Sequence, residues 1–130
     1  SLMPQADAVV CALPTTAATT DLFDAALLRT MKADAIFCNV GRGTLVIEDD
    51  LVQVLNEGHL RAAVLDVMRT EPLADGDPLW SVPRLYLSPH AAVSLDRYRQ
   101  NAWSIVADNL RRFLAGERLH NEIDLPSLTA

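Results

Sequence analysis

The segment that decides the fold is AIFCNVGRG, residues 35–43. Its first part is an apolar run with the length and residue types of a buried strand, and the run stops at the polar Asn39. Gly41 and Gly43 allow the backbone to turn tightly on either side of Arg42. The turn places Arg42 at the carboxyl end of a strand, where open α/β sheets bind their ligands. A guanidinium there suits a carboxylate or a carbonyl oxygen, although a surface salt bridge fits the same pattern.

Apolar strand patterns recur on both sides of this segment and alternate with helical patterns. In addition to the strand at 35–40, strands are expected over residues 8–13, 62–67 and 85–87. Helices are expected at about 25–32 after an Asp24 N-cap, from Glu48 to a stop at Gly58, and at about 94–115. The alternation of strands and helices predicts an α/β fold with a parallel, doubly wound sheet.

The first strand, residues 8–13, is apolar on both faces, as is typical of the interior strands of parallel sheets. No earlier segment of the chain provides a second neighbour for it, and an exposed apolar edge promotes aggregation. We therefore expect this chain to be the second half of a larger Rossmann-type domain, with the missing half on the N-terminal side.

Composition excludes several classes of function. Half of the 130 residues are hydrophobic and 22% are charged, as in ordinary globular domains. The net charge of −6 argues against a nucleic-acid partner, because phosphate binding needs clustered positive charge. No apolar run reaches the roughly 18–20 residues of a membrane span, so no membrane partner is expected. Cys11 and Cys38 lie in apolar strands without a Cys-x-x-Cys pattern, which suggests buried thiols, a cytoplasmic location and neither metal nor redox chemistry.

Ionisable side chains lie at or beyond the ends of three of the expected strands. Arg42 follows the second strand, Asp66 lies near the end of the third with Glu71 in the loop beyond it, and His90 follows the fourth. Because parallel strands end at the same edge of a sheet, these groups could converge. Taken singly, Glu71 fits a solvated acid, His90 a structural histidine and Asp66 a loop hydrogen bond. Together with Arg42 they could move a proton to or from an oxygen while binding an anion.

A complete Gly-x-Gly-x-x-Gly fingerprint is absent, because position 46 after Gly41 and Gly43 is Val. The segment is therefore not interpreted as a pyrophosphate loop. If the chain binds a dinucleotide, that loop lies in the missing half.

Short motifs follow one another along most of the chain, from residue 6 to about residue 121. They are Ala6-Asp7 with the strand to Leu13-Pro14, Thr16-x-x-Thr19, Met31-Lys32, Asn39-Val40-Gly41-Arg42-Gly43, Gly58, Ala63-Val64-Leu65-Asp66-Val67, Glu71-Pro72-Leu73, Pro78-Leu79-Trp80 and Ser88-Pro89-His90-x-Ala92. Each motif is weak by itself, but the ordered set is specific. In this order the chain resembles the D-isomer-specific 2-hydroxyacid dehydrogenases, in their C-terminal, NAD-binding portion.

The resemblance implies an oxidoreductase that transfers a hydride between NAD or NADP and a small 2-keto or D-2-hydroxy acid, such as glyoxylate, hydroxypyruvate or pyruvate. It implies that His90 is the acid and base of the reaction, that Glu71 orients His90, and that Arg42 binds the substrate carboxylate and carbonyl. The cofactor contacts that it implies are Leu13, Pro14, Val40, Gly41, Arg42, Asp66 and His90, with Thr19 a weaker candidate and no metal.

The domain boundaries also follow from the resemblance. Residues 1–116, with the long helix at about 94–115, would form the C-terminal part of the dinucleotide-binding domain, and residues 117–130 would return to a missing substrate domain. The 130-residue piece alone should be inactive, and the full-length protein should be a homodimer. Where many relatives have a Gly-rich turn after the histidine motif, this chain reads Val93-Ser94-Leu95-Asp96, which leaves the substrate subgroup open.

Two other interpretations stay open. The same scaffold could serve an NAD(H)-sensing binding protein or corepressor, which would bind the cofactor without turnover. The chain could also be a self-contained small α/β domain with a receiver-like or flavodoxin-like layout, although the strand at 8–13 would then lack a neighbour.

Overall fold

The structure is a computed structural model that describes residues 2–123. It divides into two units, Ser1–Ala92 and Val93–Ala130. The first unit carries the sheet and every candidate site residue, and the second carries the long helix. The tail expected at 117–130 lies outside the described residues from position 124 onward. The domain boundary at residue 116 stays a prediction.

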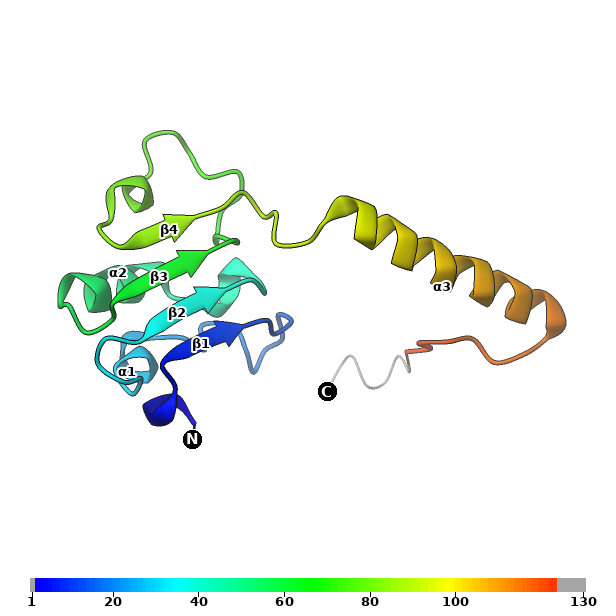
Figure 1. Ribbon diagram of the computed structural model, residues 1–130, viewed down its shortest axis with the longest axis horizontal. Coiled ribbons are helices and arrows are strands. Elements are labelled where there is room, and N and C mark those ends of the chain that lie inside the picture. The colour runs from blue at the N-terminus through cyan, green and yellow to red at the C-terminus, as the bar shows by residue number, and fades with distance from the viewer. Residues whose placement is uncertain (1, 124–130) are drawn as a thin grey trace. The chain divides into compact units, whose positions relative to one another are not determined.

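The first unit is built on a four-stranded sheet in which neighbouring strands are parallel (Figure 1). Its strands are β1 (Ala8–Cys11), β2 (Ile36–Asn39), β3 (Ala62–Leu65) and β4 (Leu85–Leu87), and they lie side by side in chain order. This arrangement confirms the predicted parallel, Rossmann-type sheet. The first three strands are shorter than expected at their carboxyl ends, because the chain leaves the ladder there to form the loops described below.

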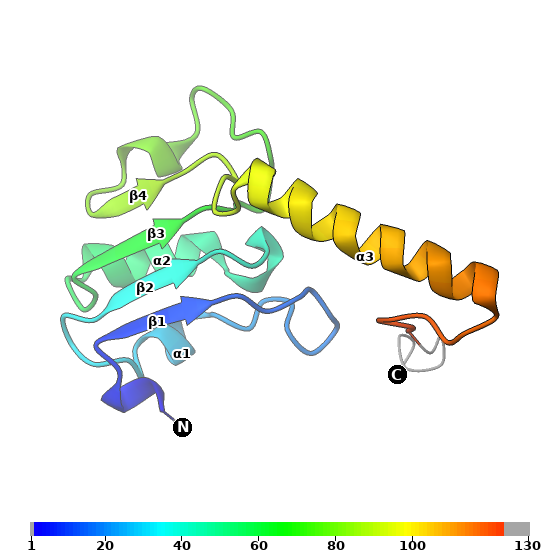
Figure 2. The same cartoon turned by 45° about the vertical axis from the view of Figure 1, so that its right-hand side comes forward.

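Helices α1 (Ala25–Leu28) and α2 (Glu48–Asn56) lie on the same face of the sheet in both views (Figures 1 and 2). Asp24 caps α1 as predicted, since its carboxylate accepts a 2.7 Å hydrogen bond from the amide of Leu27. The expected continuation of α1 to Lys32 is wrong, because the chain passes into turns after Leu28. Helix α2 begins at Glu48, and Gly58 follows its end with a φ of +77°. Single turns of 3₁₀-helix occur at Met3–Gln5, Gly43–Leu45 and Pro78–Ser81.

The hydrophobic core lies between this face of the sheet and the two helices. In β2 and β3 every second residue is buried, as expected for a sheet with one covered face. Strand residues in the core are Cys11, Phe37, Ala63 and Leu65, and helix residues are Leu28, Leu51, Val54 and Leu55. Phe37 also packs against Phe23 with ring centroids 4.9 Å apart. The core therefore fixes the orientation of each strand and of the loop that follows it.

The opposite face of the sheet has no covering helix within residues 2–92 (Figure 2). A row of paired residues crosses it, namely Val10, Cys38, Val64 and Tyr86. Val10 and Tyr86 are 64% and 63% exposed, so β1, whose Cys11 is buried in the core, leaves apolar Val10 uncovered on its other face. The prediction that both cysteines are buried holds for Cys11. It is wrong for Cys38, which is half-buried because it lies in this row.

The second unit consists of α3 (Leu95–Ala115) and the segment after it. Gly116 ends the helix in the left-handed conformation, with a φ of +70°. The apolar side chains that the sequence places along one side of this helix are exposed, among them Tyr98, Leu110 and Phe113. Within residues 2–123 no helix is both long enough and apolar enough to cross a membrane.

Candidate active site

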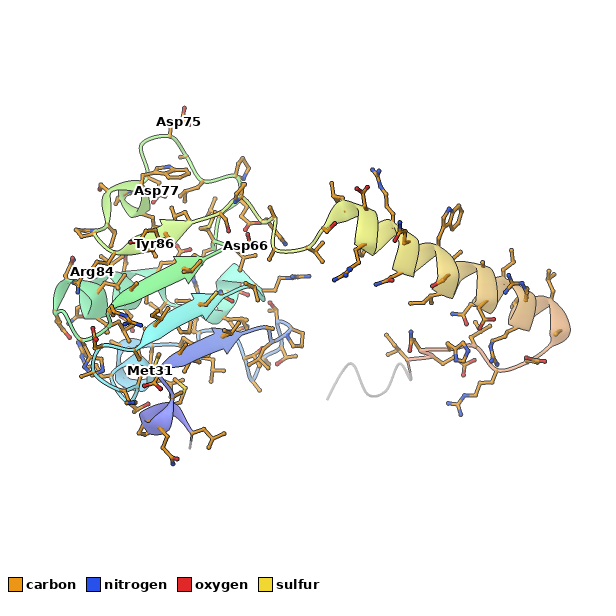
Figure 3. All side chains as sticks on the ribbon, in the orientation of Figure 1. Met31, Asp66, Asp75, Asp77, Arg84 and Tyr86 are labelled. Carbon is orange, nitrogen blue, oxygen red and sulfur yellow. The ribbon has the colours of Figure 1, made fainter. Side chains whose placement is uncertain are left out.

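The candidate site lies at the carboxyl edge of the parallel sheet. The loops after β1, β2, β3 and β4 all leave the sheet at this edge, and Figure 3 shows Asp66 at the end of β3. Each loop carries at least one of the residues singled out from the sequence.

The turn after β2 is organised by Asn39, which is fully buried. Its side-chain oxygen accepts a 3.0 Å hydrogen bond from the amide of Gly41, and its side-chain nitrogen donates a 2.8 Å bond to the carbonyl of Arg42. Sequence reasoning did not give Asn39 this function. The signal was present, because a polar residue that ends an apolar strand before a glycine is a common turn former.

Both glycines of this turn are required by close packing and not by an unusual φ, since neither has a positive φ. A Cβ on Gly41 would lie 2.7 Å from the carbonyl oxygen of Leu13, and a Cβ on Gly43 would lie 2.0 Å from that of Met68. The expectation of conformational freedom at these positions is therefore corrected. The two glycines bring the loop after β2 into backbone contact with the loops after β1 and β3.

Arg42 is exposed on this turn. One guanidinium nitrogen, Nη1, donates a 2.7 Å hydrogen bond to the carbonyl of Gly41. Within residues 2–123 Arg42 makes no hydrogen bond or ion pair with Glu71 or His90. The predicted convergence of ionisable groups is therefore seen for Asp66, Glu71 and His90, whereas Arg42 is not bonded to them among the described residues.

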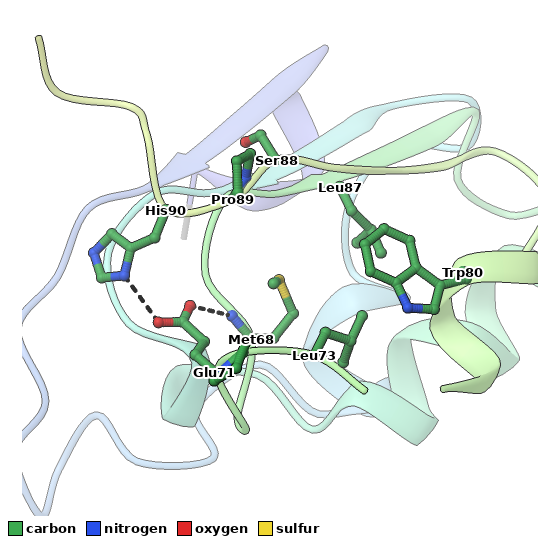
Figure 4. A pocket seen from close by; sticks show the side chains of 9 residues that line it. Met68, Glu71, Leu73, Trp80, Leu87, Ser88, Pro89 and His90 are labelled. Carbon is green, nitrogen blue, oxygen red and sulfur yellow. Dashed lines mark hydrogen bonds and ion pairs between the residues drawn. The ribbon is translucent and has the colours of Figure 1, made fainter. Parts of the chain in front are cut away.

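Glu71 and His90 form a direct pair (Figure 4). The Oε2 atom of Glu71 lies 2.9 Å from Nδ1 of His90, and its Oε1 atom accepts a 2.9 Å bond from the amide of Met68. These two bonds, that of His90 first, lower the pKa of the Glu71 carboxyl. Because an ionised carboxylate can only accept, Nδ1 of His90 must be the donor. The second ring nitrogen, Nε2, is then the atom that can exchange a proton with a ligand.

Asp66 is buried at the end of β3, with 3% of its surface exposed. Its Oδ1 atom accepts hydrogen bonds from the Ser88 hydroxyl and the Ala91 amide, and its Oδ2 atom accepts one from the Ala92 amide. Burial raises the pKa of this carboxyl, but the three hydrogen bonds outweigh it and the net shift is downward. The structure agrees with the alternative stated for Asp66, a loop hydrogen bond, but the sequence did not indicate which loop supplies the donors.

A cavity of about 580 Å³ lies beside the Glu71–His90 pair (Figure 4). Its apolar wall consists of Met68, Pro72, Leu73, Trp80, Leu87 and Pro89. The indole nitrogen of Trp80 donates a 2.8 Å hydrogen bond to the carbonyl of Ala74, which ties the indole to its loop. The pair thus has an apolar surface on one side, while the side chain of His90 is 53% exposed and that of Glu71 is 32% exposed.

The remaining cofactor candidates lie at the ends of β1 and β2. Leu13 and Pro14 are exposed, and Val40 is half-buried, with its amide bonded to the carbonyl of Cys11 at 2.9 Å. The hydroxyl of Thr19 donates a 2.7 Å hydrogen bond to the carbonyl of Pro14, so it braces this loop. Among the described residues, no group of three or more His, Cys, Asp or Glu side chains is placed to hold a metal ion.

Comparison with known families gives a match over residues 1–92 to the D-isomer specific 2-hydroxyacid dehydrogenase family, in its NAD binding domain. The matched range contains the whole sheet and all the residues of the candidate site.

Similar proteins come from several bacteria. The chain is 40% identical over 117 residues to glyoxylate/hydroxypyruvate reductase B of Citrobacter koseri. The alignment covers 90% of this chain and 36% of that protein. It is also 40% identical over 121 residues to an uncharacterised protein of Corynebacterium melassecola, covering 93% of this chain and 40% of that one. The chain therefore spans about two-fifths of the length of these relatives.

Solved structures show the same similarity. The NADPH-dependent glyoxylate/hydroxypyruvate reductase of Sinorhizobium meliloti, in complex with NADP and sulfate, is 32% identical with a TM-score of 0.84, covering 94% of this chain and 40% of that one. A D-isomer specific 2-hydroxyacid dehydrogenase from Xanthobacter autotrophicus, in complex with NADPH and MES, is 36% identical with a TM-score of 0.81, covering 95% and 52%.

Proposed function

The chain belongs to the D-isomer specific 2-hydroxyacid dehydrogenase family, and on that premise we propose that it provides the acid–base residues of an enzyme that reduces a small 2-keto acid. The observation that carries the proposal is the 2.9 Å bond between Glu71 and Nδ1 of His90 at the carboxyl edge of the sheet. A histidine oriented by a carboxylate is suited to proton transfer near neutral pH.

The residues at this edge fit a dinucleotide cofactor, NAD or NADP. Leu13 is 42% exposed and its backbone packs against Gly41, so its side chain offers an apolar surface at this edge. The carboxylate of Asp66 accepts three hydrogen bonds, and a carboxylate has about four acceptor sites, so one is left for an amide donor. When bound, the cofactor supplies the hydride. Leu13, Pro14, Val40, Gly41, Arg42, Asp66 and His90 would hold it.

His90 would act as the proton donor in the direction of reduction. Its Nδ1 atom is engaged by Glu71, so Nε2 delivers the proton to the 2-keto oxygen as that oxygen gains negative charge. Glu71 stays ionised because its pKa is lowered, and its negative charge stabilises the protonated ring. In the direction of oxidation the same nitrogen removes the hydroxyl proton.

Arg42 would bind the carboxylate of the substrate. Its guanidinium carries five N–H donors, and the bond to Gly41 engages only one of its nitrogens. The remaining donors can bind a carboxylate through two parallel hydrogen bonds and polarise the adjacent carbonyl. The reductase relatives point to glyoxylate, hydroxypyruvate or a similarly small 2-keto acid as the substrate.

The whole protein is proposed to be a cytoplasmic homodimer without nucleic-acid or membrane partners, and the 130-residue chain alone is proposed to be inactive. Sedimentation of the complete gene product would test the dimer. An assay of the isolated chain under the conditions below would test its inactivity.

The test of the function uses the complete gene product that contains this chain. Oxidation of NADH and NADPH is followed with glyoxylate, hydroxypyruvate and pyruvate, for the unchanged protein and for His90→Asn. We expect His90→Asn to lower kcat about 10²-fold or more, the usual contribution of a positioned acid or base. The matched control is His120→Asn, because His120 also pairs with a carboxylate, that of Asp108 at 3.0 Å, but lies in the second unit.

Turnover that is lost in His90→Asn and kept in His120→Asn supports the proposal. It is contradicted if His90→Asn keeps the full rate, or if the unchanged protein binds the cofactor tightly and reduces none of the acids. The second outcome would favour a protein that senses NAD(H).

A further inference from the structure

The segment Ser88–Ala92, here called the His90 loop, is attached to the sheet mainly through one residue, Asp66. The backbone amide of His90 donates a 2.8 Å hydrogen bond to the carbonyl of Asp66. The amides of Ala91 and Ala92 donate 2.9 Å bonds to its two carboxylate oxygens, and the Ser88 hydroxyl donates to Oδ1. The carboxylate and the backbone carbonyl of Asp66 thus accept hydrogen bonds from four of the loop's five residues.

These bonds hold a backbone conformation that histidine does not readily adopt. The φ of His90 is +52°, in the left-handed region that non-glycine residues rarely occupy. His90, Ala91 and Ala92 are exposed, so apolar packing does little to restrain them. The direction of the imidazole toward Glu71 therefore depends on the hydrogen bonds to Asp66.

The dependence runs in both directions. A carboxylate that is 97% buried must be satisfied by donors, and the three donors to Asp66 all come from the His90 loop. The loop cannot move away without leaving a buried charge unpaired. The conformation of His90 is thus stabilised before any ligand arrives.

We propose that Asp66 is a positioning residue that holds the His90 loop in the conformation that brings the imidazole to Glu71. This goes beyond the cofactor contact proposed for Asp66, which uses its remaining acceptor site. The catalytic consequence rests on the proposed function, but the positioning itself can be measured without substrate or cofactor.

The experiment compares the unchanged protein with Asp66→Asn, both labelled with ¹⁵N and free of cofactor. Asparagine keeps one acceptor oxygen and loses the other, so either the Ala91 or the Ala92 amide loses its partner. We expect the amide hydrogen that loses its partner, that of Ala91 or that of Ala92, to exchange about tenfold faster, as for the loss of one ordinary hydrogen bond. The ¹⁵N shift of His90 Nδ1 should also move toward that of a free imidazole. Asp108→Asn, which removes the carboxylate beside His120, is the matched control and should change neither signal.

A second pair of variants covers the case in which Asp66→Asn does not fold. Ser88→Ala removes one donor and leaves the Asp66 carboxylate in place, whereas Ser88→Thr restores a hydroxyl. Faster exchange of Ala91 and Ala92 in Ser88→Ala, and recovery in Ser88→Thr, would support the proposal. Exchange in Ser88→Ala equal to that of the unchanged protein would overturn it.

Steady-state kinetics of the complete gene product separate positioning from cofactor binding. Positioning predicts that Asp66→Asn lowers kcat about tenfold or more together with the change in the His90 signal. The proposal is overturned if Asp66→Asn raises only the KM for the cofactor and leaves the amide exchange and the Nδ1 shift unchanged. If the exchange and the shift change but the unchanged protein reduces no 2-keto acid, the proposed function fails and the positioning stands.

Discussion

Gly43 shows how single residues connect the parts of the site. Its α-carbon packs so closely against the backbone of Met68 that a methyl group would overlap the carbonyl oxygen. The amide of the same residue, Met68, donates a hydrogen bond to Glu71. The turn that carries Arg42 is therefore in contact with the backbone that holds Glu71, although no bond joins the two side chains in residues 2–123.

Gly43→Ala should accordingly destabilise the protein by about 2 kcal/mol or more, since overpacking against backbone cannot be relieved by a change of rotamer. The measurement is the free energy of unfolding in urea. Gly76→Ala is the control, because a Cβ at Gly76 would meet no atom within 4 Å and its φ is not positive. Equal stabilities of the two variants would contradict the account of the turn.

Glu71 makes a pH dependence testable. Its pKa is lowered in the folded protein, so its contribution to stability is complete above the unfolded pKa of about 4.3. That contribution is lost as the pH falls through the lower folded pKa. Glu71→Gln lacks this contribution, and its stability should fall less than that of the unchanged protein between about pH 5 and pH 3.

Urea unfolding at several pH values measures this difference. Asp75→Asn, in the exposed loop before Asp77, serves as the control and should follow the unchanged protein. If the free energy of unfolding falls equally with decreasing pH in Glu71→Gln and in the unchanged protein, the pair with His90 contributes nothing to stability.

At the scale of elements, the sequence predicted those features that depend on residues close to one another in the chain. The order of strands and helices, the Asp24 cap and the glycine that follows α2 were all predicted from neighbouring residues.

Asp24→Ala should cost about 1 kcal/mol of stability, because the amide of Leu27 would lose its acceptor. Thermal or urea unfolding measures the loss. Asp24→Ser, which restores a capping oxygen, should recover most of it, and no recovery would argue against capping as the cause.

The boundaries of elements were predicted less well, for reasons that are tertiary. The strand expected at 62–67 ends at Leu65, because Asp66 turns its carboxylate toward a loop that follows another strand. The donors to Asp66 lie 22 to 26 residues further along the chain, so no local pattern reveals them. The same holds for Gly43, whose neighbour Met68 is brought close only by the register of β2 and β3. The common edge of the parallel strands predicted only that Glu71 and His90 could converge, and the resemblance implied that the two residues form a pair.

At the scale of the whole molecule, the sheet leaves a row of side chains on its second face uncovered by any helix of residues 2–92. This agrees with the coverage of the relatives, because the chain spans only about two-fifths of their length. Val10 and Tyr86 belong to this row, and Figure 3 labels Tyr86 on β4. The relative from Corynebacterium melassecola, of which the alignment covers 40%, has correspondingly more chain to place around such a sheet. The activity is therefore proposed for the complete gene product, while the fold and the Glu71–His90 pair are properties of this chain.

The product of hydroxypyruvate reduction tests the central claim most directly, because the family to which the chain belongs is specific for the D-isomer. The complete gene product is incubated with hydroxypyruvate and NADPH or NADH, and the glycerate formed is resolved by chiral chromatography. The account predicts D-glycerate from the unchanged protein and about 10²-fold less of it from His90→Asn. Formation of L-glycerate, or an equal yield of D-glycerate from His90→Asn, would contradict it.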